Sequence, residues 1–429
     1  MLAGLSQFGL KTQHFRCRAC PTGTEAIHRL TGLPGRHLDD WLMPEEVCRS
    51  AFLRGTCYAD IAIVEGTVAP ALPWVHCRDF DTPGAISPIA QYLNLPRVAV
   101  IHCPRYADLH LPTLSNEIDA VLIDGLERAE DFGPISQMIR LTTRRPVLGA
   151  VEALPALRRE VESGARGNPM SQEAVKALAS TFLKHADMAA IRALAVSRPL
   201  DCDECEATPC GGDIRPFRVA CARDEIFGGY FPDTLEALAA YGAEFEFFSP
   251  LSDGELPSNV ELVMFGCGHP ERDPLTLSSN ACLFAQLKDY VRQGKRIYAE
   301  GGGAAYLGQG FTIDDRFYPG AGILPYVAQM LDEPRLPYRV SRVTQKDAWL
   351  GRSGTEVRGY HSGRWWLEAA PIESHCESCY GCLTSDRDMW FHHHVVGSLV
   401  HLHLASLPEF IAAFAAPHQP SLTLPGVIR

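Results

Sequence analysis

A glycine-rich turn in the second half of the chain is of a kind that can position a catalytic residue. The apolar run at residues 295–299, Lys-Arg-Ile-Tyr-Ala, predicts a strand, and it leads directly into Glu300-Gly-Gly-Gly303. Where a strand turns into a helix, one side chain and several backbone N–H groups are presented at the carboxyl edge of the sheet, and enzymes place nucleophiles there. The same glycines also permit a tight turn with positive φ. The turn by itself leaves a catalytic and a purely structural interpretation open.

Three groups of closely spaced cysteines are a second candidate for chemistry. Two-residue gaps let successive thiolates converge on one zinc ion or iron–sulfur cluster, whereas cysteines that only pack in a core are scattered. We predict metal or cluster binding by the last group, with a fourth ligand from His375, the middle group or a bound ligand. Surface thiols are the alternative. The groups are Cys17 with Cys20, then Cys202, Cys205 and Cys210, and finally Cys376, Cys379 and Cys382.

A run of three histidines, His392-His-His394, lies between the last cysteine group and His401. Imidazoles bind transition metals and the axial position of a tetrapyrrole, but three successive side chains point in different directions on a strand or a helix. At most two of them can share a site. The alternative is a polar stretch that enters the last strand.

The elements that must position these residues follow a βαβ pattern in both halves. Short apolar runs alternate with helical segments, which is typical of a doubly wound parallel sheet covered by helices. In the first half we predict strands at residues 60–65, 97–101, 118–124 and 146–149, helices at 44–54 and 136–140, and one long amphipathic helix at 171–194. In the second half we predict strands at 217–222, 244–248, 260–265 and 295–299, and helices at 233–241 and 280–293.

The length and composition indicate two domains. A chain of 429 residues is too long for one core of ordinary size, and residues 197–216 break the βαβ rhythm with three prolines, two glycines and three cysteines. We predict domains at residues 1–196 and 217–429 with this segment as the linker. The net charge of −12 argues against nucleic acid and anionic membranes as partners. No long apolar run or secretion signal occurs, which predicts a cytoplasmic protein.

The order of segments from Arg218 to Pro417 resembles the cobyrinic acid a,c-diamide synthase family, which consists of glutamine-dependent amidotransferases of tetrapyrroles. The resemblance implies an α/β protein in which a degenerate P-loop-like parallel-sheet domain precedes a class I glutamine-amidotransferase-like domain. The segments that carry it are Val219-Ala-Cys-Ala-Arg-Asp-Glu-Ile-Phe227, Tyr230-Phe-Pro232, Gly242-Ala-Glu-Phe-Glu-Phe-Phe-Ser-Pro-Leu251, Gly266-Cys-Gly-His-Pro-Glu271, Leu277-Ser-Ser-Asn280, Tyr298-Ala-Glu-Gly-Gly-Gly303 and Val400-His-Leu-His-Leu-Ala-Ser406.

The resemblance also implies roles for residues around the turn. The family places its catalytic cysteine where this chain has Gly301, and its activating histidine at His401. A family loop thought to supply oxyanion contacts corresponds to Gly266 through Gly268. Glycine offers no atom for a thioester, so glutamine hydrolysis by that route is not expected. Cys267 replaces a glycine of the loop, and it is either a substitute nucleophile or a packed or ligating thiol.

In the first half, the family holds ATP and magnesium through a Gly-rich loop with a lysine, and this sequence has no such motif. Residues 9–15, Gly-Leu-Lys-Thr-Gln-His-Phe, resemble the end of the helix after that loop, which predicts a chain that begins downstream of it. Either the start lies further upstream or ATP is not bound in the usual way. Glu65 ends a strand that resembles a family segment, and it either approaches magnesium or faces solvent.

Together these features predict a cobyrinate a,c-diamide synthase-like protein for amidation of a corrinoid or siroheme side chain, without glutaminase activity. It would bind the tetrapyrrole and use free ammonia or a partner protein that supplies the missing parts. The alternative is a non-catalytic carrier or scaffold that binds a tetrapyrrole or an iron–sulfur cluster. The sequence leaves open whether the chain is an enzyme, and a homodimer is expected.

Overall fold

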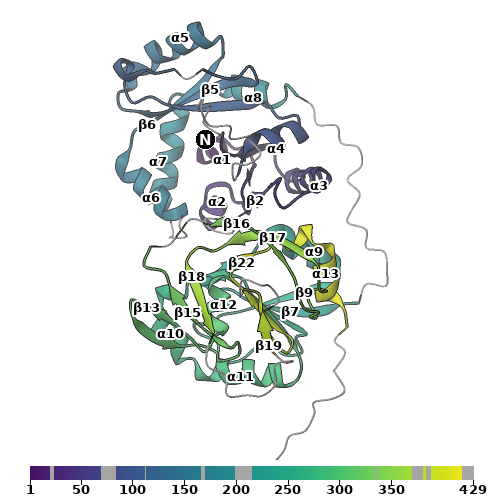
Figure 1. Cartoon of the computed structure of the whole chain (residues 1–429). Coiled ribbons are helices and arrows are strands. Elements are labelled where there is room, and N and C mark those ends of the chain that lie inside the picture. Colours follow the sequence, from purple (N-terminus) through teal and green to yellow (C-terminus); the bar gives the residue numbers. More distant parts are fainter. Residues whose placement is uncertain are drawn as a thin grey trace, which may run out of the picture. The chain divides into compact units, whose positions relative to one another are not determined.

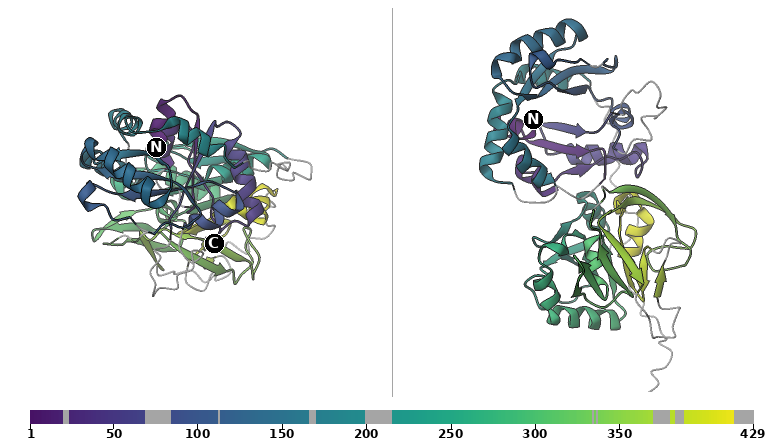
Figure 2. Two further views of the ribbon diagram at one scale, coloured as in Figure 1. Left: turned by 90° about the horizontal axis from the view of Figure 1, so that it is seen from above. Right: turned by 60° about the vertical axis from the view of Figure 1, so that its left-hand side comes forward.

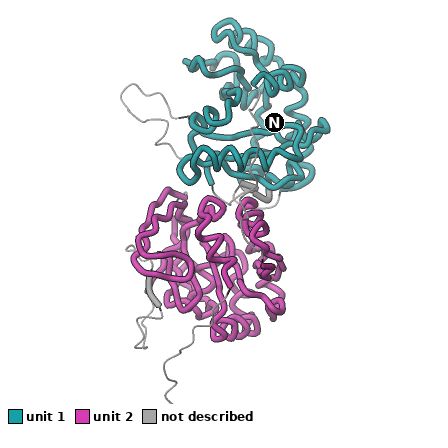
Figure 3. The backbone as a smooth tube through the Cα atoms, turned by 90° about the vertical axis from the view of Figure 1, so that its right-hand side faces the viewer, with its two compact units in different colours: residues 1–206 teal, residues 207–429 magenta. Residues whose placement is uncertain are grey.

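The chain folds into two compact units, Met1–Glu206 and Ala207–Arg429 (Figure 3). The boundary falls inside residues 197–216, where the sequence predicts a linker. None of the described helices has both the length and the apolar character needed to cross a membrane. The computed structural model describes all residues except 20–23, 69–83, 112, 166–169, 199–214, 334, 336, 370–379, 383–387 and 418–429.

Unit 1 is built from short parallel strands and helices (Figure 1). The strands are β1 (Thr12–Arg16), β2 (Arg36–His37), β3 (Ile61–Glu65), β4 (Arg97–His102), β5 (Ile118–Leu126) and β6 (Val147–Glu152). The helices are α1 (Leu2–Gln7), α2 (Thr24–Thr31), α3 (Glu45–Thr56), α4 (Ile86–Tyr92), α5 (Phe132–Thr143), α6 (Pro155–Ala165), α7 (Gln172–Leu183) and α8 (Met188–Ala195).

The strands of unit 1 form two three-stranded parallel sheets, in the orders β2-β1-β3 and β4-β5-β6. The parallel α/β class predicted from the sequence is confirmed, but among the described residues no ladder joins β3 to β4 into one doubly wound sheet. Both sheets contribute to one hydrophobic cluster, where Ile61 and Ile63 of β3 and Val98 of β4 are only partly buried. Strands with the apolar composition of central strands thus lie at sheet edges.

The prediction of one long helix at residues 171–194 is wrong, because the segment forms two helices, α7 and α8. The carboxylate of Asp187 accepts a hydrogen bond from the N–H of Ala190 at 2.9 Å, which caps the start of α8. An aspartate at an N-cap satisfies a backbone donor that lacks a partner inside the helix. The apolar period continues across this cap, so periodicity alone could not reveal the break.

Unit 2 combines a large sheet with helices on both sides and additional small sheets. The helices are α9 (Pro232–Ala240), α10 (Pro274–Ser279), α11 (Ala281–Arg292), α12 (Gly302–Leu307) and α13 (Pro408–Ala415). The strands are β7 (Phe217–Ala222), β8 (Phe227–Gly229), β9 (Ala243–Phe248), β10 (Leu262–Phe265), β11 (Cys267–Gly268), β12 (Arg296–Glu300), β13 (Gly310–Ile313), β14 (Arg316–Pro319), β15 (Tyr326–Met330), β16 (Tyr338–Val343), β17 (Glu356–His361), β18 (Trp365–Ala369), β19 (Tyr380–Cys382), β20 (Trp390–His392), β21 (Val395–Ser398) and β22 (Val400–His401).

The large sheet has the order β19-β20-β21-β12-β10-β7-β9. The ladders from β21 to β9 are parallel, and β19 and β20 add an antiparallel edge. Successive residues of a strand point to opposite faces, and β10 follows this rule: Val263 and Phe265 enter one hydrophobic cluster and Met264 enters the other. Helix α11 packs in the first cluster and α13 in the second, so they cover opposite faces (Figure 2).

Residues 310–369 add strands that the sequence pattern did not lead us to predict. They form a four-stranded sheet, β14-β13-β15-β18, and supply β16 and β17 to a three-stranded sheet that β22 completes in the order β16-β17-β22. In β18, Trp365 and Leu367 are buried and Trp366 is exposed, so a two-residue period was available as a signal. The second sheet matters for chemistry, because β17 pairs with β22 and thereby holds His401 opposite Tyr360.

Candidate functional site at the carboxyl edge of β12

The turn after β12 has the geometry of a strand-to-helix elbow. Gly301 precedes α12 with φ 54° and ψ −119°, a backbone conformation that residues other than glycine rarely adopt. Its N–H donates to the carbonyl of Ser398 at 2.8 Å, and its carbonyl accepts from Ala305 at 3.1 Å. The backbone of the turn is therefore held from both sides.

Residues 266–268 pack directly against this elbow. A Cβ on Gly302 would lie 2.1 Å from the carbonyl oxygen of Gly268, and one on Gly303 would lie 2.7 Å from that of Gly266. Real Cβ atoms do not approach backbone oxygen so closely, so only glycine allows the loop and the helix to meet here. The predicted binding residues Gly266 and Gly268 thus adjoin the elbow, with carbonyl oxygens turned toward α12.

His401 and Cys267 meet beside Gly301. The Sγ atom of Cys267 lies 3.6 Å from Nε2 of His401. A Cβ on Gly301 would lie 2.6 Å from Cε1 of His401 and 3.6 Å from the same Sγ atom. His401 is buried and Cys267 is partly exposed. The structure therefore brings together the three residues that the sequence singled out around the turn, although they are far apart in the chain.

Glu300 completes this cluster, and the sequence pattern did not lead us to include it. One carboxylate oxygen lies 3.6 Å from Nδ1 of His401. The other accepts a hydrogen bond from the N–H of Leu402 at 3.1 Å and one from the hydroxyl of Tyr298. Because both donors lie in the core, they hold the carboxylate in place. The signal in the sequence was its position directly before Gly301, at the end of the strand.

Burial and the neighbouring ionisable groups shift the pKa values within this cluster. Burial alone lowers the pKa of His401, but the adjacent Cys267 thiol and Glu300 carboxylate outweigh it and raise the pKa well above its usual value. Burial and the nearby Glu300 also raise the pKa of the Tyr298 hydroxyl, which keeps its proton and donates a hydrogen bond to the carboxylate. A protonated imidazole between the sulfur of Cys267 and the Glu300 carboxylate is thus the favoured state of the ring.

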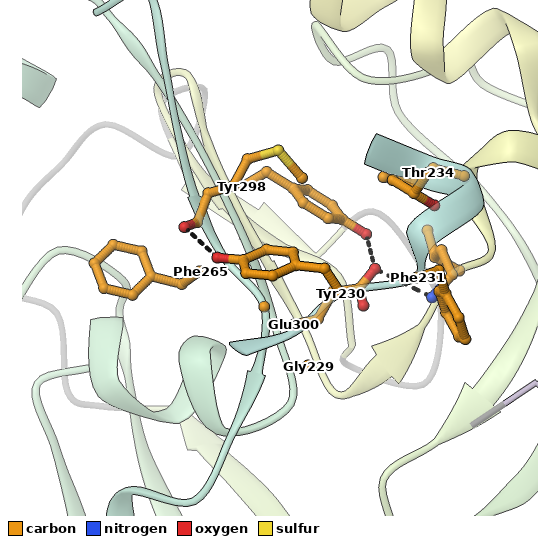
Figure 4. Close-up of a pocket in the computed structure, with 11 residues that line it drawn as sticks. Gly229, Tyr230, Phe231, Thr234, Phe265, Tyr298 and Glu300 are labelled. Carbon is orange, nitrogen blue, oxygen red and sulfur yellow. Dashed lines mark hydrogen bonds between the residues drawn. The ribbon is translucent and has the colours of Figure 1, made fainter. Parts of the chain in front are cut away.

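A small cavity adjoins Glu300, with Tyr230 and Tyr298 in its wall (Figure 4). The Tyr230 hydroxyl lies 2.8 Å from the carbonyl oxygen of Met264 and 3.0 Å from that of Ala222, and burial raises its pKa. The cavity measures about 10 Å³, which is room for about one water molecule. This volume is too small for glutamine or a macrocycle.

The predicted metal ligands do not form a site that can be described. Cys20, Cys202, Cys205, Cys210, Cys376 and Cys379 lie outside the described residues, as does His375, and of Cys382 only its place in β19 is defined. Cys17 is buried, and burial raises its pKa, which favours the thiol over a thiolate ligand. Within the described part of the chain, no group of three or more potential ligands surrounds a metal position.

The histidine run forms a hairpin. His392 ends β20, His393 adopts a positive φ of 51°, and the chain returns into β21 after His394. Burial lowers the pKa of His392, and the His394 carbonyl accepts a hydrogen bond from Ile297 at 3.1 Å. The run therefore serves as the turn before β21.

Glu65, the candidate magnesium ligand, lies at the end of β3. Its carboxylate bonds Nε2 of His14 at 3.0 Å, and this hydrogen bond lowers the pKa of Glu65. Its side chain is 60% exposed. Magnesium is usually bound by one or two carboxylates together with water and phosphate oxygens, so the role of Glu65 as a magnesium ligand stays a prediction.

Comparisons with known proteins agree with this geometry. Residues 218–408 match the family model described as a CobB/CobQ-like glutamine amidotransferase domain. The chain is 28% identical to the cobyrinate a,c-diamide synthase of Syntrophotalea carbinolica over 96% of its length and 93% of that protein. It is 27% identical to the synthase of the same name from Synechocystis, over 97% of the chain and 89% of that protein.

Two solved structures are similar to part of the chain. A crystal structure of a glutamine amidotransferase is 15% identical, with a TM-score of 0.34, and covers 46% of this chain and 98% of that one. The structure of PurLQS from Thermotoga maritima is 14% identical, with a TM-score of 0.35, and covers 47% and 96%.

The parallel sheet, the elbow after β12 and the matched family model define unit 2 as a class I glutamine-amidotransferase-like domain. Residues 218–408 belong with the CobB/CobQ-like glutamine amidotransferase domains, and along nearly its whole length the chain is similar to cobyrinate a,c-diamide synthases. The elbow of this domain carries a glycine, Gly301.

Proposed function

We propose that this chain takes part in converting carboxylate side chains of a tetrapyrrole into amides, with cobyrinate as the first candidate substrate. The observation that carries the proposal is the retained site: His401, Glu300 and the 266–268 loop surround an elbow in a protein whose relatives are named cobyrinate a,c-diamide synthases. A siroheme-type macrocycle is the second candidate, since it presents the same kind of carboxylate.

The elbow itself does not hydrolyse glutamine in this proposal. In the family's route the thioester forms on the elbow residue, and Gly301 has no side chain to attack the amide carbon. An imidazole that accepts a proton cannot replace the atom that forms the bond. Nitrogen must therefore reach the tetrapyrrole as free ammonia, from a partner protein, or from another group of the site.

An amidation assay tests this function directly. The purified chain is incubated with cobyrinate, ammonium chloride, ATP and magnesium, and the products are separated and weighed by mass spectrometry. Exchange of a carboxylate for a carboxamide, lost when ATP is omitted, is the expected result. Cobyrinate that stays unchanged with ammonium, in the presence of ATP, would overturn the proposal.

A second candidate function is a carrier or scaffold that binds the macrocycle or an iron–sulfur cluster without catalysis. The glycine at the elbow favours it, because position 301 cannot carry out the family's first half-reaction. Absorption spectra and metal analysis after anaerobic purification separate the two candidates. A bound chromophore or cluster without amide formation supports the carrier, and a colourless, metal-free protein that forms amides rules it out.

A further inference from the structure

The thiol of Cys267 occupies the side of the elbow that the glycine leaves open. Its Sγ atom is 3.6 Å from the position that a Cβ on Gly301 would take, and 3.6 Å from Nε2 of His401. Of the cysteines in the described part of the chain, Cys48 and Cys221 are buried and Cys282 is exposed, whereas Cys267 is partly exposed. A partly exposed thiol beside a buried imidazole is both reachable and provided with a base.

The other side of the imidazole is held by a fixed carboxylate. Glu300 faces Nδ1 of His401 at 3.6 Å, so Nε2 is directed toward the sulfur. The order thiol, imidazole, carboxylate is the arrangement by which a nucleophile is activated, and such contacts are commonly long before substrate binds. The raised pKa of His401 means that the ring holds a proton beside the sulfur, where it can be passed to a leaving group.

Core packing and metal ligation account less well for this thiol. A purely packed cysteine would be enclosed by apolar side chains, as Cys221 is in the core of the sheet, whereas Cys267 is partly exposed and contacts a histidine. A metal site would need a third donor on the same side, but Glu300 lies at the opposite nitrogen of the ring and no three-ligand group occurs among the described residues.

We propose that Cys267 is a catalytic nucleophile that attacks primary carboxamides. It lies in the 266–268 loop, whereas the fold normally carries its nucleophile on the elbow residue. With the thiol proton held on His401, Sγ of Cys267 attacks the carboxamide carbon. The C–N bond breaks, and the proton passes from His401 to the departing ammonia, which leaves a thioester on Cys267. Water then cleaves the thioester and releases the carboxylic acid and the free thiol. Glu300 is the positioning residue for His401.

This inference rests on the proposed function only in that the ammonia would serve the amidation. Glutamine is the probe, and the purified full-length chain is assayed without any tetrapyrrole, so the outcome does not depend on amidation. We expect glutamate release that Cys267→Ala abolishes and that His401→Gln slows by about a hundredfold. Cys282→Ala, which removes an exposed thiol away from the cluster, is the matched control and should release glutamate as the wild type does.

Thiol labelling provides a second readout, which keeps the test valid if a variant is unstable. The wild-type chain is treated with substoichiometric iodoacetamide, and labelled peptides are quantified by mass spectrometry. Cys267 should react about tenfold faster than Cys282. In His401→Gln the labelling rate of Cys267 should fall, while that of Cys282 should stay the same. Equal labelling of the two thiols, or glutamate release that persists in Cys267→Ala, would overturn the proposal. Failure of ammonium-dependent amidation alone would count against the proposed function and leave this inference standing.

Discussion

Two strands, one in each unit, end at a glutamate that is followed by a glycine. The two glutamates have different environments. Strand β3 ends at Glu65, followed by Gly66, and β12 ends at Glu300, followed by Gly301. In the ladder order, β3 is an edge strand with partly exposed residues, whereas β12 lies between β21 and β10 and is buried throughout. The same local ending therefore occurs once at an open edge and once inside a sheet.

The consequence for the carboxylates is large. The Glu65 side chain is 60% exposed and that of Glu300 is 8% exposed, although each faces a histidine. A carboxylate in water is screened and contributes little, while a buried one interacts strongly with its neighbours and must be satisfied by donors. The comparison teaches that the position of a strand in its sheet decides whether a terminal glutamate acts as a surface ion pair or as part of a site.

The strongest test of this contrast removes the buried carboxylate. Glu300→Ala leaves His401 and the N–H of Leu402 without their acceptor in the core, so we expect the free energy of unfolding to fall by about 3 kcal/mol. Urea denaturation measures it. Glu300→Gln retains one carbonyl oxygen and should recover part of the loss. A loss below that of a surface variant would contradict the contrast.

A methyl group at the elbow is expected to have the next largest effect. Gly301→Ala adds a Cβ 2.6 Å from His401 at a positive φ of 54°, and we expect a loss of about 2 kcal/mol. Gly354→Ala is the matched control, because its φ is 89° and nothing lies within 4 Å. It should lose about 1 kcal/mol, from the backbone conformation alone. Equal losses in thermal or urea unfolding would show that His401 moves aside freely.

The raised pKa of His401 predicts a pH dependence of stability. The imidazolium is favoured in the folded chain, so its contribution is fully present below about pH 6.5, the unfolded value, and is lost as the pH rises through the higher folded value. Unfolding free energies measured from pH 6 upward should therefore fall more steeply in the wild type than in His401→Gln. Parallel curves would indicate that His401 is neutral in the folded state.

The smallest effect is expected at the exposed glutamate. Glu65→Gln weakens the contact with His14, and because the side chain is exposed the loss at neutral pH should stay below about 1 kcal/mol. The lowered pKa of Glu65 means that its contribution is present above about pH 4.5 and is lost as the pH falls through the folded value. Wild-type and variant stabilities should then converge in acid. A loss as large as that of Glu300→Ala would remove the distinction between the two strands.

Most of the parallel architecture could be predicted from the sequence, because the predicted strands 118–124 and 260–265 contain continuous apolar runs, at 120–123 and 262–265. Strands such as β16 and β18, between residues 310 and 369, could not, since they are short and half-exposed and lack such runs. At the site, Gly301, His401 and Cys267 were identified through a resemblance. Glu300 was missed, because a glutamate at a strand end is ordinarily exposed, as Glu65 is.

The sequence by itself determined which residue types are available at the elbow: a glycine at position 301, a thiol at 267 and an imidazole at 401. Only the tertiary structure decided that they meet. Cys267 and His401 are separated by 134 positions, and their contact at 3.6 Å depends on two strands whose neighbours are set by sheet order. Local sequence determines conformation and chemical type, but proximity across a sheet depends on long-range packing of both faces, and this is a property of the whole core.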